Sequence, residues 1–380
     1  MKIIVLANQL LGEKISSGGD VLSLTSLKRM NQDFHVLGPK ASRSSVRDYL
    51  GKHHFYSTDN TKIIPSSNFV GGLLIVYLYF LRTVNSVKYI SKLKNGQVVY
   101  LTGDFLCNSL VAFLIKAFNP QIKVVCNFYH LNPNPSHRTG NIINNTVSFL
   151  LQRVSLRVIK KTSDIIFVLS NKGAKELIKI GFNKKDIKVT GAGIDLDKIK
   201  KFPKINQKGD AVFLGRLNKS KGIYDALNII KIITKKSPKF KLLIIGASSV
   251  SELKNIKRMA KTMNIESNIE YLGFISEREK YSIMKSTPLL VAPSHEEGYG
   301  IGLLEGLACG MFVVAYDLKI YHEVFGEYKK YIKYIKPKDY QSFANAILFF
   351  KKQQQSKKQK MRNVSETWEN VSRKQQTFFI

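Results

Sequence analysis

The sequence is poor in acidic residues and in cysteine. It has 27 Asp and Glu against 60 Lys and Arg in 380 residues, so its formal net charge is +33. The three cysteines, Cys107, Cys126 and Cys309, lie far apart and form no C-x-x-C pair. This spacing excludes a disulfide framework and a zinc knuckle, and it favours a reducing compartment.

Long apolar runs are also missing. The most apolar stretch, residues 69–81, is shorter than the roughly 20 residues that a membrane-spanning helix needs. Residues 1–8 are apolar, but they lack the long hydrophobic region and the small-residue cleavage site of a signal peptide. We therefore expect them to form a first buried strand.

The excess of basic residues indicates an anionic partner, such as nucleic acid, acidic lipid headgroups or phosphorylated ligands. Only 12 of the 60 basic residues are Arg and 48 are Lys, whereas proteins that read nucleic acid rely more heavily on Arg. A lysine-rich background explains the same composition. The charge alone does not decide among these interpretations.

The length favours two domains, and short β-branched runs alternate with amphipathic stretches, which is typical of parallel sheets with crossover helices. Strands are predicted at 2–7, 34–37, 98–101, 122–127 and 165–169, and then at 211–214, 241–245, 269–272, 289–292 and 312–315. Helices are predicted at 69–81, 105–118 and 141–161. A charged stretch, 198–209, is the predicted linker.

The predicted fold class is therefore α/β, with two Rossmann-like domains whose parallel sheets face each other across a cleft. The predicted domains are residues 1–198 and 209–355. The remaining residues, 356–380, form a basic tail with an aromatic end, which we expect to be helical and to pack back on the first domain. Such folds bind ligands at the carboxyl ends of their strands.

The strongest motif is Pro293-Ser-His-Glu-Glu-Gly-Tyr-Gly-Ile-Gly-Leu-Leu-Glu-Gly-Leu-Ala-Cys-Gly310, which follows an apolar run and opens an amphipathic helix. Its glycines leave backbone N–H groups bare at a helix N-terminus, which suits a phosphate or a sugar hydroxyl. Glu297 and Glu305 can both face one pocket, and carboxylates accept hydrogen bonds from a polyol. The alternative is a glycine-rich turn between strand and helix without a ligand.

The second motif is Phe213-Leu-Gly-Arg-Leu-Asn-Lys-Ser-Lys-Gly222. A predicted strand ends at Gly215, and Arg216 and Lys221 follow just before a helix. A diphosphate leaving group needs its developing negative charge neutralised, which an Arg and a Lys at the end of a strand can do. The alternative is a solvated turn, which is our interpretation of Lys219.

These two motifs, in this order, resemble the family 4 glycosyltransferases of the GT-B fold. The resemblance extends over residues 1–325 and includes further segments with matching order: Gly18-Gly19, Ser163–Ser170, Gly191–Asp195, Leu243–Gly246 and Tyr271–Phe274. It implies an acceptor-binding first domain and a second domain that binds a nucleotide sugar. The chain departs from the family where Gly306 stands for another small residue, where Gly310–Val314 lacks a proline, and in Thr190–Asp195.

The resemblance implies roles for individual residues. Arg216 and Lys221, next to Gly215, would bind the diphosphate of the donor, and Glu305 would hold its ribose. Glu297 would hold the transferred sugar together with the backbone of four residues: Gly298, Tyr299, Gly300 and Ile301. Gly19 would bring its N–H against the phosphate or the sugar. His130 matches the family's histidine beside sugar and acceptor, although a loop histidine without a role fits equally well. His295 and His137 are interpreted as structural or peripheral.

The predicted function is a retaining, metal-independent hexosyltransferase that takes its sugar from a UDP-, GDP- or other nucleotide-diphosphate sugar and needs no cofactor. Asp195-Leu-Asp197 spells a pattern that can hold a metal with a nucleotide sugar, but its place before the linker favours a structural role. One alternative is an epimerase or hydrolase of the same fold, acting on a sugar nucleotide. Another is a basic nucleic-acid-binding protein, which the absence of a known recognition motif disfavours.

The first domain predicts a membrane partner. The apolar stretch 69–81 is flanked by Arg82, Lys88, Lys92 and Lys94, and the helix at 141–161 mixes apolar residues with Arg153, Arg157, Lys160 and Lys161. Apolar and basic helices suit an anionic membrane surface, while a core helix is the alternative for 69–81. We expect peripheral association with the cytoplasmic membrane face and a lipid-linked saccharide or glycolipid as acceptor. Nucleic acid is not an expected partner.

Overall fold

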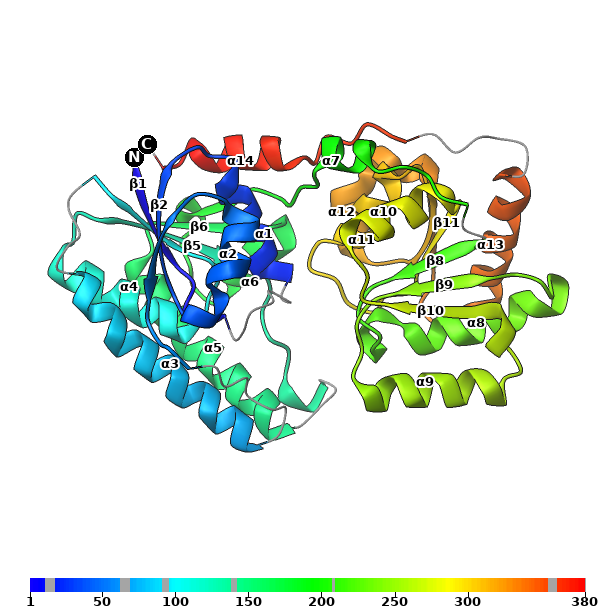
Figure 1. Cartoon of the computed structure of the whole chain (residues 1–380), viewed down its shortest axis with the longest axis horizontal. Coiled ribbons are helices and arrows are strands. Elements are labelled where there is room, and N and C mark those ends of the chain that lie inside the picture. The colour runs from blue at the N-terminus through cyan, green and yellow to red at the C-terminus, as the bar shows by residue number, and fades with distance from the viewer. Residues whose placement is uncertain are drawn as a thin grey trace. The chain divides into compact units, whose positions relative to one another are not determined.

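The chain divides into two compact units, which are described separately (Figure 1). The computed structural model describes residues 1–10, 18–61, 69–90, 96–137, 142–206, 209–354 and 361–379. Unit 1 comprises Met1–Gly193 and Trp368–Ile380, and unit 2 comprises Ile194–Thr367. This division differs from the predicted boundaries at 198, 209 and 355.

Unit 1 is built on a seven-stranded parallel sheet with the order β3-β2-β1-β4-β5-β6-β7. The strands are β1 (Lys2–Leu6), β2 (Asp33–Gly38), β3 (His54–Ser57), β4 (Val98–Leu101), β5 (Lys123–Phe128), β6 (Ile165–Val168) and β7 (Ile187–Val189). The central strands are continuous apolar runs because helices cover both faces of a parallel sheet. β1 lies between β2 and β4, and its residues Ile3 to Leu6 are buried.

The helices of unit 1 alternate with these strands. They are α1 (Gly18–Lys28), α2 (Arg43–Leu50), α3 (Phe69–Ile90), α4 (Leu106–Phe118), α5 (Ile142–Thr162), α6 (Asn171–Lys179) and α14 (Trp368–Gln376). α3 packs against α4 and α5, and this group of helices covers one side of the sheet in Figure 1.

Helix α3 corrects the prediction of a short apolar segment at 69–81. It spans 22 residues, and over Gly71–Ile90 it is long and apolar enough to cross a membrane by length and composition. Its second half contains polar residues that the structure buries: Arg82 forms an ion pair with Asp59 and donates to the carbonyls of Asn8 and Leu10. Lys92 and Lys94 lie outside the described residues.

The C-terminal segment packs on unit 1. The ring of Phe379 is buried beside Tyr100 and Phe167, and Ser26 of α1 donates a hydrogen bond to Gln375 of α14. Helix α14 is shorter than the predicted tail, whose residues 356–360 lie outside the described part of the chain. Apolar burial at the aromatic end, rather than the basic residues, attaches this segment.

Unit 2 contains a six-stranded parallel sheet with the order β10-β9-β8-β11-β12-β13. Its strands are β8 (Ala211–Leu214), β9 (Leu242–Ile245), β10 (Ile269–Gly273), β11 (Leu289–Ala292), β12 (Phe312–Tyr316) and β13 (Ile332–Ile335). Its helices are α7 (Leu196–Lys201), α8 (Ile223–Lys236), α9 (Val250–Thr262), α10 (Glu277–Ser286), α11 (Ile301–Ala308), α12 (Lys319–Phe325) and α13 (Tyr340–Gln354). The buried core joins the sheet to α8 and α13.

The predicted linker 198–209 is partly wrong, because it begins inside α7. Asp195 is the N-cap of this helix, since its Oδ1 accepts a hydrogen bond from the backbone N–H of Lys198 at 2.9 Å. Lys285 of α10 then donates to the carbonyls of Ile199, Lys200 and Phe202, which attaches α7 to unit 2. The run of lysines favoured the prediction of a solvated linker. The contacts of this helix with Lys285 involve a residue far along the chain, which the local sequence does not indicate.

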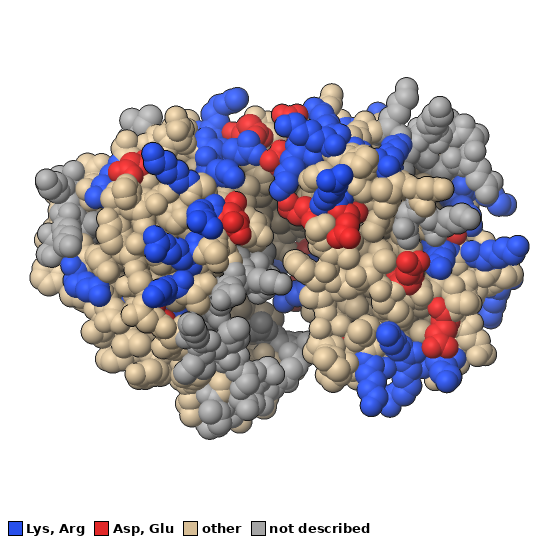
Figure 2. Space-filling model, in the orientation of Figure 1, with Lys and Arg blue, Asp and Glu red and all other residues tan. Residues whose placement is uncertain are grey.

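The α/β class and the two Rossmann-like parallel sheets are confirmed. Figure 2 shows where part of the positive charge lies: Lys and Arg side chains gather over α9, where Lys254, Lys257, Arg258 and Lys261 line a surface hollow. Strands β3, β7 and β13 were not predicted, because edge strands have shorter and less apolar sequences.

Candidate functional site

The first predicted motif residue, Gly215, follows directly after β8 at the carboxyl edge of the unit 2 sheet. Its φ of 152° and the 154° of Gly246 accompany a close approach of two backbones. A Cβ at Gly246 would lie 1.8 Å from the carbonyl oxygen of Gly215, so no side chain fits there. The next residue, Arg216, has an exposed side chain and forms no ion pair with any residue in the described part of the chain.

Lys221 closes a short 3-10 helix, Lys219–Lys221, between β8 and α8. Asn218 is its N-cap, because its Oδ1 accepts from the backbone N–H of Lys221 at 3.0 Å. Gly222 then turns the chain into α8 with φ of 72°, and a Cβ there would lie 1.9 Å from the carbonyl oxygen of Pro293. Glycine at this position therefore allows the loop after β8 to touch the loop after β11.

The glycine-rich motif connects β11 to α11. Gly300, with φ of 98°, is the N-cap of α11, and its carbonyl accepts the N–H groups of Leu303 and Leu304. The rings of Tyr321 and Phe325 pack against Gly300, where a Cβ would lie 2.8 Å from the Tyr321 ring. The left-handed conformation and this contact both require glycine. The N–H groups at the start of α11 are left without helical partners, as at any helix N-terminus.

Two polar contacts also join the two motifs. The backbone N–H of His295 donates to the carbonyl of Ser220 at 2.8 Å, and Lys221 Nζ lies 2.6 Å from Glu297 Oε1. The Lys221 and Glu297 side chains are 22% and 15% exposed, so both remain accessible from solvent. The structure thus places the two motifs side by side at the ends of the adjacent strands β8 and β11. Only the resemblance to the family 4 glycosyltransferases predicted this proximity.

Glu305, in the second turn of α11, is held by residues of α10. Its Oε1 accepts from Lys280 Nζ at 2.7 Å and from Tyr281 Oη at 2.6 Å. Burial alone would lower the pKa of Lys280, but the Glu305 carboxylate outweighs it and the pKa is raised. Burial, with Glu305 adding to it, also raises the pKa of Tyr281 well above its usual value. Both side chains therefore stay protonated donors, and no residue in the described ranges donates to Oε2.

Sequence reasoning missed Lys280, Tyr281 and Asp225. Asp225, in the first turn of α8, accepts from Tyr316 Oη at 2.7 Å and lies 2.8 Å from His295 Nε2. It therefore anchors the start of the glycine-rich loop to α8 and β12. His295, predicted to be structural, has this partner. Neither α8 nor α10 carries a local motif that indicates these contacts, because the residues in each pair lie far apart in the sequence.

Gly19 and His130 lie in unit 1. Gly19 is near the start of α1, and a Cβ there would lie 2.6 Å from the ring of Tyr129. His130 follows β5 and is exposed, and its carbonyl accepts from Gln152 Nε2 at 2.9 Å. Gln152 also donates to Asp104 at 2.7 Å. His130 thus lies at the carboxyl edge of the unit 1 sheet, and Gly19 lies beside Tyr129 from the same edge. The side chain of His137 lies outside the described part of the chain.

Comparisons with known proteins bear on both units. Residues 195–368 match the profile of the family described as glycosyl transferases group 1. An uncharacterized 41.2 kDa protein in the cps region of Klebsiella pneumoniae is 27% identical over 180 residues, which cover 45% of this chain and 48% of that protein. A phosphatidyl-myo-inositol mannosyltransferase of Mycobacterium tuberculosis is 28% identical over 138 residues, or 35% of each chain. The matches thus span about half or less of these relatives.

A solved structure shows that the likeness in fold extends further than the likeness in sequence. The Anabaena protein HepE, solved in complex with UDP and glucose, aligns with 99% of this chain and 94% of its own, with a TM-score of 0.66 and 15% identity. At this identity the comparison shows the fold alone, which is of the GT-B type. The profile match at 195–368 covers both motif loops, so this part of the chain is similar to the group 1 glycosyl transferases.

Proposed function

We propose that this protein transfers a hexose-type sugar from a nucleoside-diphosphate sugar to an acceptor. The observation that carries the proposal is the contact between Lys221 and Glu297, which joins a cationic loop and a glycine-rich helix N-terminus at one sheet edge of unit 2. The cationic loop suits a diphosphate. The carboxylate and the free N–H groups of the helix N-terminus suit sugar hydroxyls. Unit 2 is therefore the proposed donor-binding unit.

Arg216 and Lys221 are the proposed ligands of the diphosphate. As the bond to the anomeric carbon breaks, negative charge develops on the leaving phosphate, and two cations held beside it lower the barrier. We propose a retaining reaction in which the leaving phosphate takes the proton of the acceptor hydroxyl, so no protein nucleophile is needed. Arg216 supports this role best, because its exposed guanidinium forms no ion pair with a described residue.

Glu305 is the proposed ligand of the ribose, and Glu297 that of the transferred sugar, together with the backbone from Gly298 to Ile301. The two donors on Oε1 of Glu305 fix the carboxylate and leave Oε2 to accept from a hydroxyl. We propose a metal-independent reaction. In support, Asp195 of the Asp-Xaa-Asp pattern caps α7, and Asp197 lies 3.1 Å from Lys200. Gly19 and His130 are proposed to act toward the sugar and the acceptor.

A lipid-linked saccharide or glycolipid is the proposed acceptor, reached by peripheral association with the cytoplasmic membrane face. Helix α3 supports this, because an apolar stripe runs along its exposed side, and Figure 2 shows little charge over it. The stripe consists of Leu73, Val76, Tyr77, Phe80, Val84 and Val87, each at least 39% exposed. Exposed basic residues follow at Lys88 on α3 and at Arg157 on α5. The name of the mycobacterial relative, a phosphatidyl-myo-inositol mannosyltransferase, also supports a lipid acceptor.

The test is a thermal-shift panel of UDP- and GDP-sugars, followed by product analysis with and without polyprenyl-diphosphate saccharides. A donor should raise the melting temperature by mass action, and sugar should appear on the acceptor. Release of an epimer or of free sugar without acceptor would favour the epimerase or hydrolase alternative. Steep salt-dependent binding to duplex DNA or RNA, with no response to any nucleotide sugar, would favour a nucleic-acid-binding protein.

A further inference from the structure

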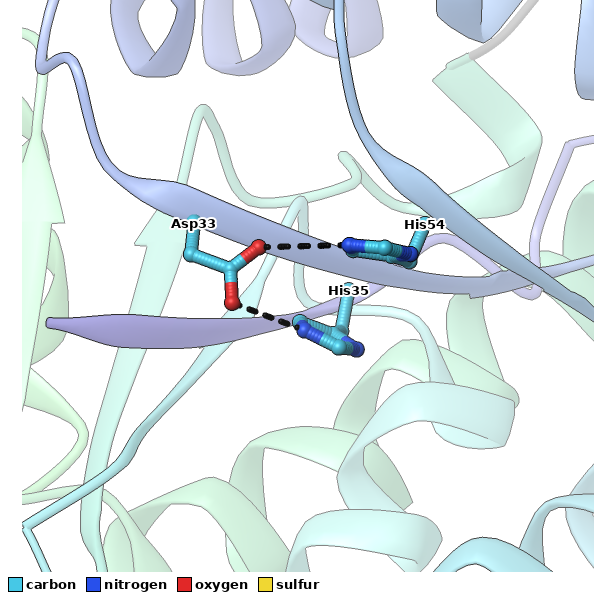
Figure 3. A group of neighbouring side chains, drawn as sticks. All are labelled: Asp33, His35 and His54. Atoms are coloured by element: carbon cyan, nitrogen blue, oxygen red, sulfur yellow. Dashed lines mark hydrogen bonds and ion pairs between the residues drawn. The ribbon is translucent and has the colours of Figure 1, made fainter.

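Two histidines and one aspartate converge at the edge of the unit 1 sheet, far along the strands from the carboxyl edge. Asp33 and His35 lie two residues apart on β2, so their side chains share one face of the sheet. The parallel register places His35 directly beside His54 of the edge strand β3. Figure 3 shows the Asp33 carboxylate facing both imidazoles, with one oxygen directed at His35 and the other at His54.

The ligand atoms of this group are close enough to share one cation. Asp33 Oδ2 lies 3.0 Å from His35 Nε2, and Asp33 Oδ1 lies 3.7 Å from His54 Nε2. One ligand atom from each side chain lies within 4.8 Å of the others. A tetrahedral Zn²⁺ with bonds of about 2.0–2.1 Å holds its ligand atoms about 3.4 Å apart. Small side-chain rotations therefore convert the hydrogen-bonded group into a coordination shell.

His35 is already fixed in the orientation that coordination needs. Its side chain is 10% exposed, and its Nδ1 is 2.9 Å from Tyr56 Oη. When Nε2 binds a metal, Nδ1 carries the proton and donates a hydrogen bond to Tyr56 Oη, with which it is already in contact. His54 stacks on His35 with ring centroids 4.6 Å apart, and its 65% exposed side chain is able to turn toward the ion.

We propose that Asp33, His35 and His54 form a Zn²⁺ site that ties the edge strand β3 to β2. Two imidazoles and a carboxylate are a ligand set that zinc accepts, with a fourth position left for water. Lys2 lies on the neighbouring strand, in register with Asp33. Its positive charge lowers the affinity for a cation, so we expect binding in the micromolar range. The site is independent of the proposed donor site in unit 2.

The test is zinc binding by the full chain, purified without a histidine tag. Isothermal titration with ZnCl₂ should show one Zn²⁺ per chain, and the melting temperature should rise with ZnCl₂ but not with MgCl₂. Tyr56→Phe removes the partner of His35 Nδ1 and should weaken binding about tenfold. His54→Ala removes a ligand and should weaken it further. Co²⁺ added to the wild type should give visible d–d absorption bands that His54→Ala loses.

His53→Ala is the matched control. His53 directly precedes β3, and its ring packs edge-on against Phe55, whose side chain lies on the opposite face of β3 from His54. Its ring nitrogen Nδ1 contacts the carbonyl of Gly51 at 2.6 Å. This variant should bind Zn²⁺ like the wild type. The proposal is overturned if the wild type binds no Zn²⁺ at 100-fold excess, or if a folded His54→Ala variant binds it as tightly as the wild type. Because none of these measurements uses glycosyl transfer, their outcome is separate from that of the proposed activity.

Discussion

Lys221 Nζ lies 2.6 Å from Oε1 of Glu297, although 76 positions separate the two residues in the sequence. One side chain ends the loop after β8, and the other stands in the loop after β11. Their contact brings together a cation suited to a phosphate and a carboxylate suited to a sugar hydroxyl. The proposed donor would compete with this ion pair for both side chains.

Arg216→Ala should reduce turnover about 100- to 1000-fold, because one group that stabilises the charge of the leaving phosphate is lost. The variant should remain folded, since the guanidinium is exposed. Steady-state transfer rates measure the effect. Lys219→Ala, which removes an exposed cation from the same loop, is the control and should keep wild-type turnover. Full activity of Arg216→Ala would contradict the assignment.

Glu305→Gln should weaken donor binding about tenfold, because a hydrogen bond from a hydroxyl to a charged acceptor is stronger than one to an amide. Gln keeps the shape of the side chain and takes away the charge that raises the pKa of Lys280. Titration calorimetry with the donor measures the loss. Glu323→Gln on α12 serves as the comparison, and equal affinity in both variants would count against a ribose-binding role.

Phe80→Asp should weaken binding to anionic vesicles about tenfold. A Phe side chain contributes about 1.5–3 kcal/mol when it leaves water, and Phe80 is 68% exposed in the middle of the α3 stripe. Co-sedimentation with vesicles of anionic and of neutral lipid measures the effect. Phe274→Asp is the matched control, because Phe274 is 81% exposed in unit 2. If both variants bind equally, α3 is not the membrane-facing element.

As the pH rises from 4 to 6, the protein should become less stable because of Asp104. Burial raises the pKa of this carboxyl from 3.8 to about 6. The folded chain therefore keeps a proton that the unfolded chain releases, and the free energy of unfolding falls as the pH rises through that window. A shift of this size corresponds to on the order of 3 kcal/mol.

Asp104→Asn removes this titration while Gln152 keeps an oxygen to which it donates. The free energy of unfolding of the variant minus that of the wild type should be larger at pH 7.5 than at pH 4. Urea unfolding of both proteins at the two pH values measures this difference. Asp48→Asn on α2, where the carboxylate is exposed, should show no such difference. A stability difference between Asp104→Asn and the wild type that is the same at both pH values would show that Asp104 titrates normally.

The sequence was sufficient for the central strands, because strands such as β1 and β11 are apolar runs buried on both faces. It was not sufficient for β3, which begins with the exposed His54, or for the second half of α3. There Arg82 reads as an exposed residue that ends an apolar segment. The structure buries it against Asp59, a partner 23 positions away that no local pattern indicates.

The candidate site divides in the same way. The glycines and the charged residues of each motif could be predicted because they lie close together in the sequence. The backbone conformation also requires some of the glycines, as at Gly300. The residues that hold the motifs could not. Lys280 and Tyr281 reach Glu305 from α10, and Asp225 reaches His295 from α8. These contacts depend on how helices pack, which periodicity does not specify.

The most direct test of the central claim is a calorimetric titration of the full chain with UDP and GDP. If the loops after β8 and β11 bind the diphosphate of the donor, one of these nucleotides should bind at a single site. Arg216→Ala should weaken that binding at least about tenfold, and Lys219→Ala should leave it unchanged. Binding of neither nucleotide, or equal binding by Arg216→Ala and the wild type, would contradict the account.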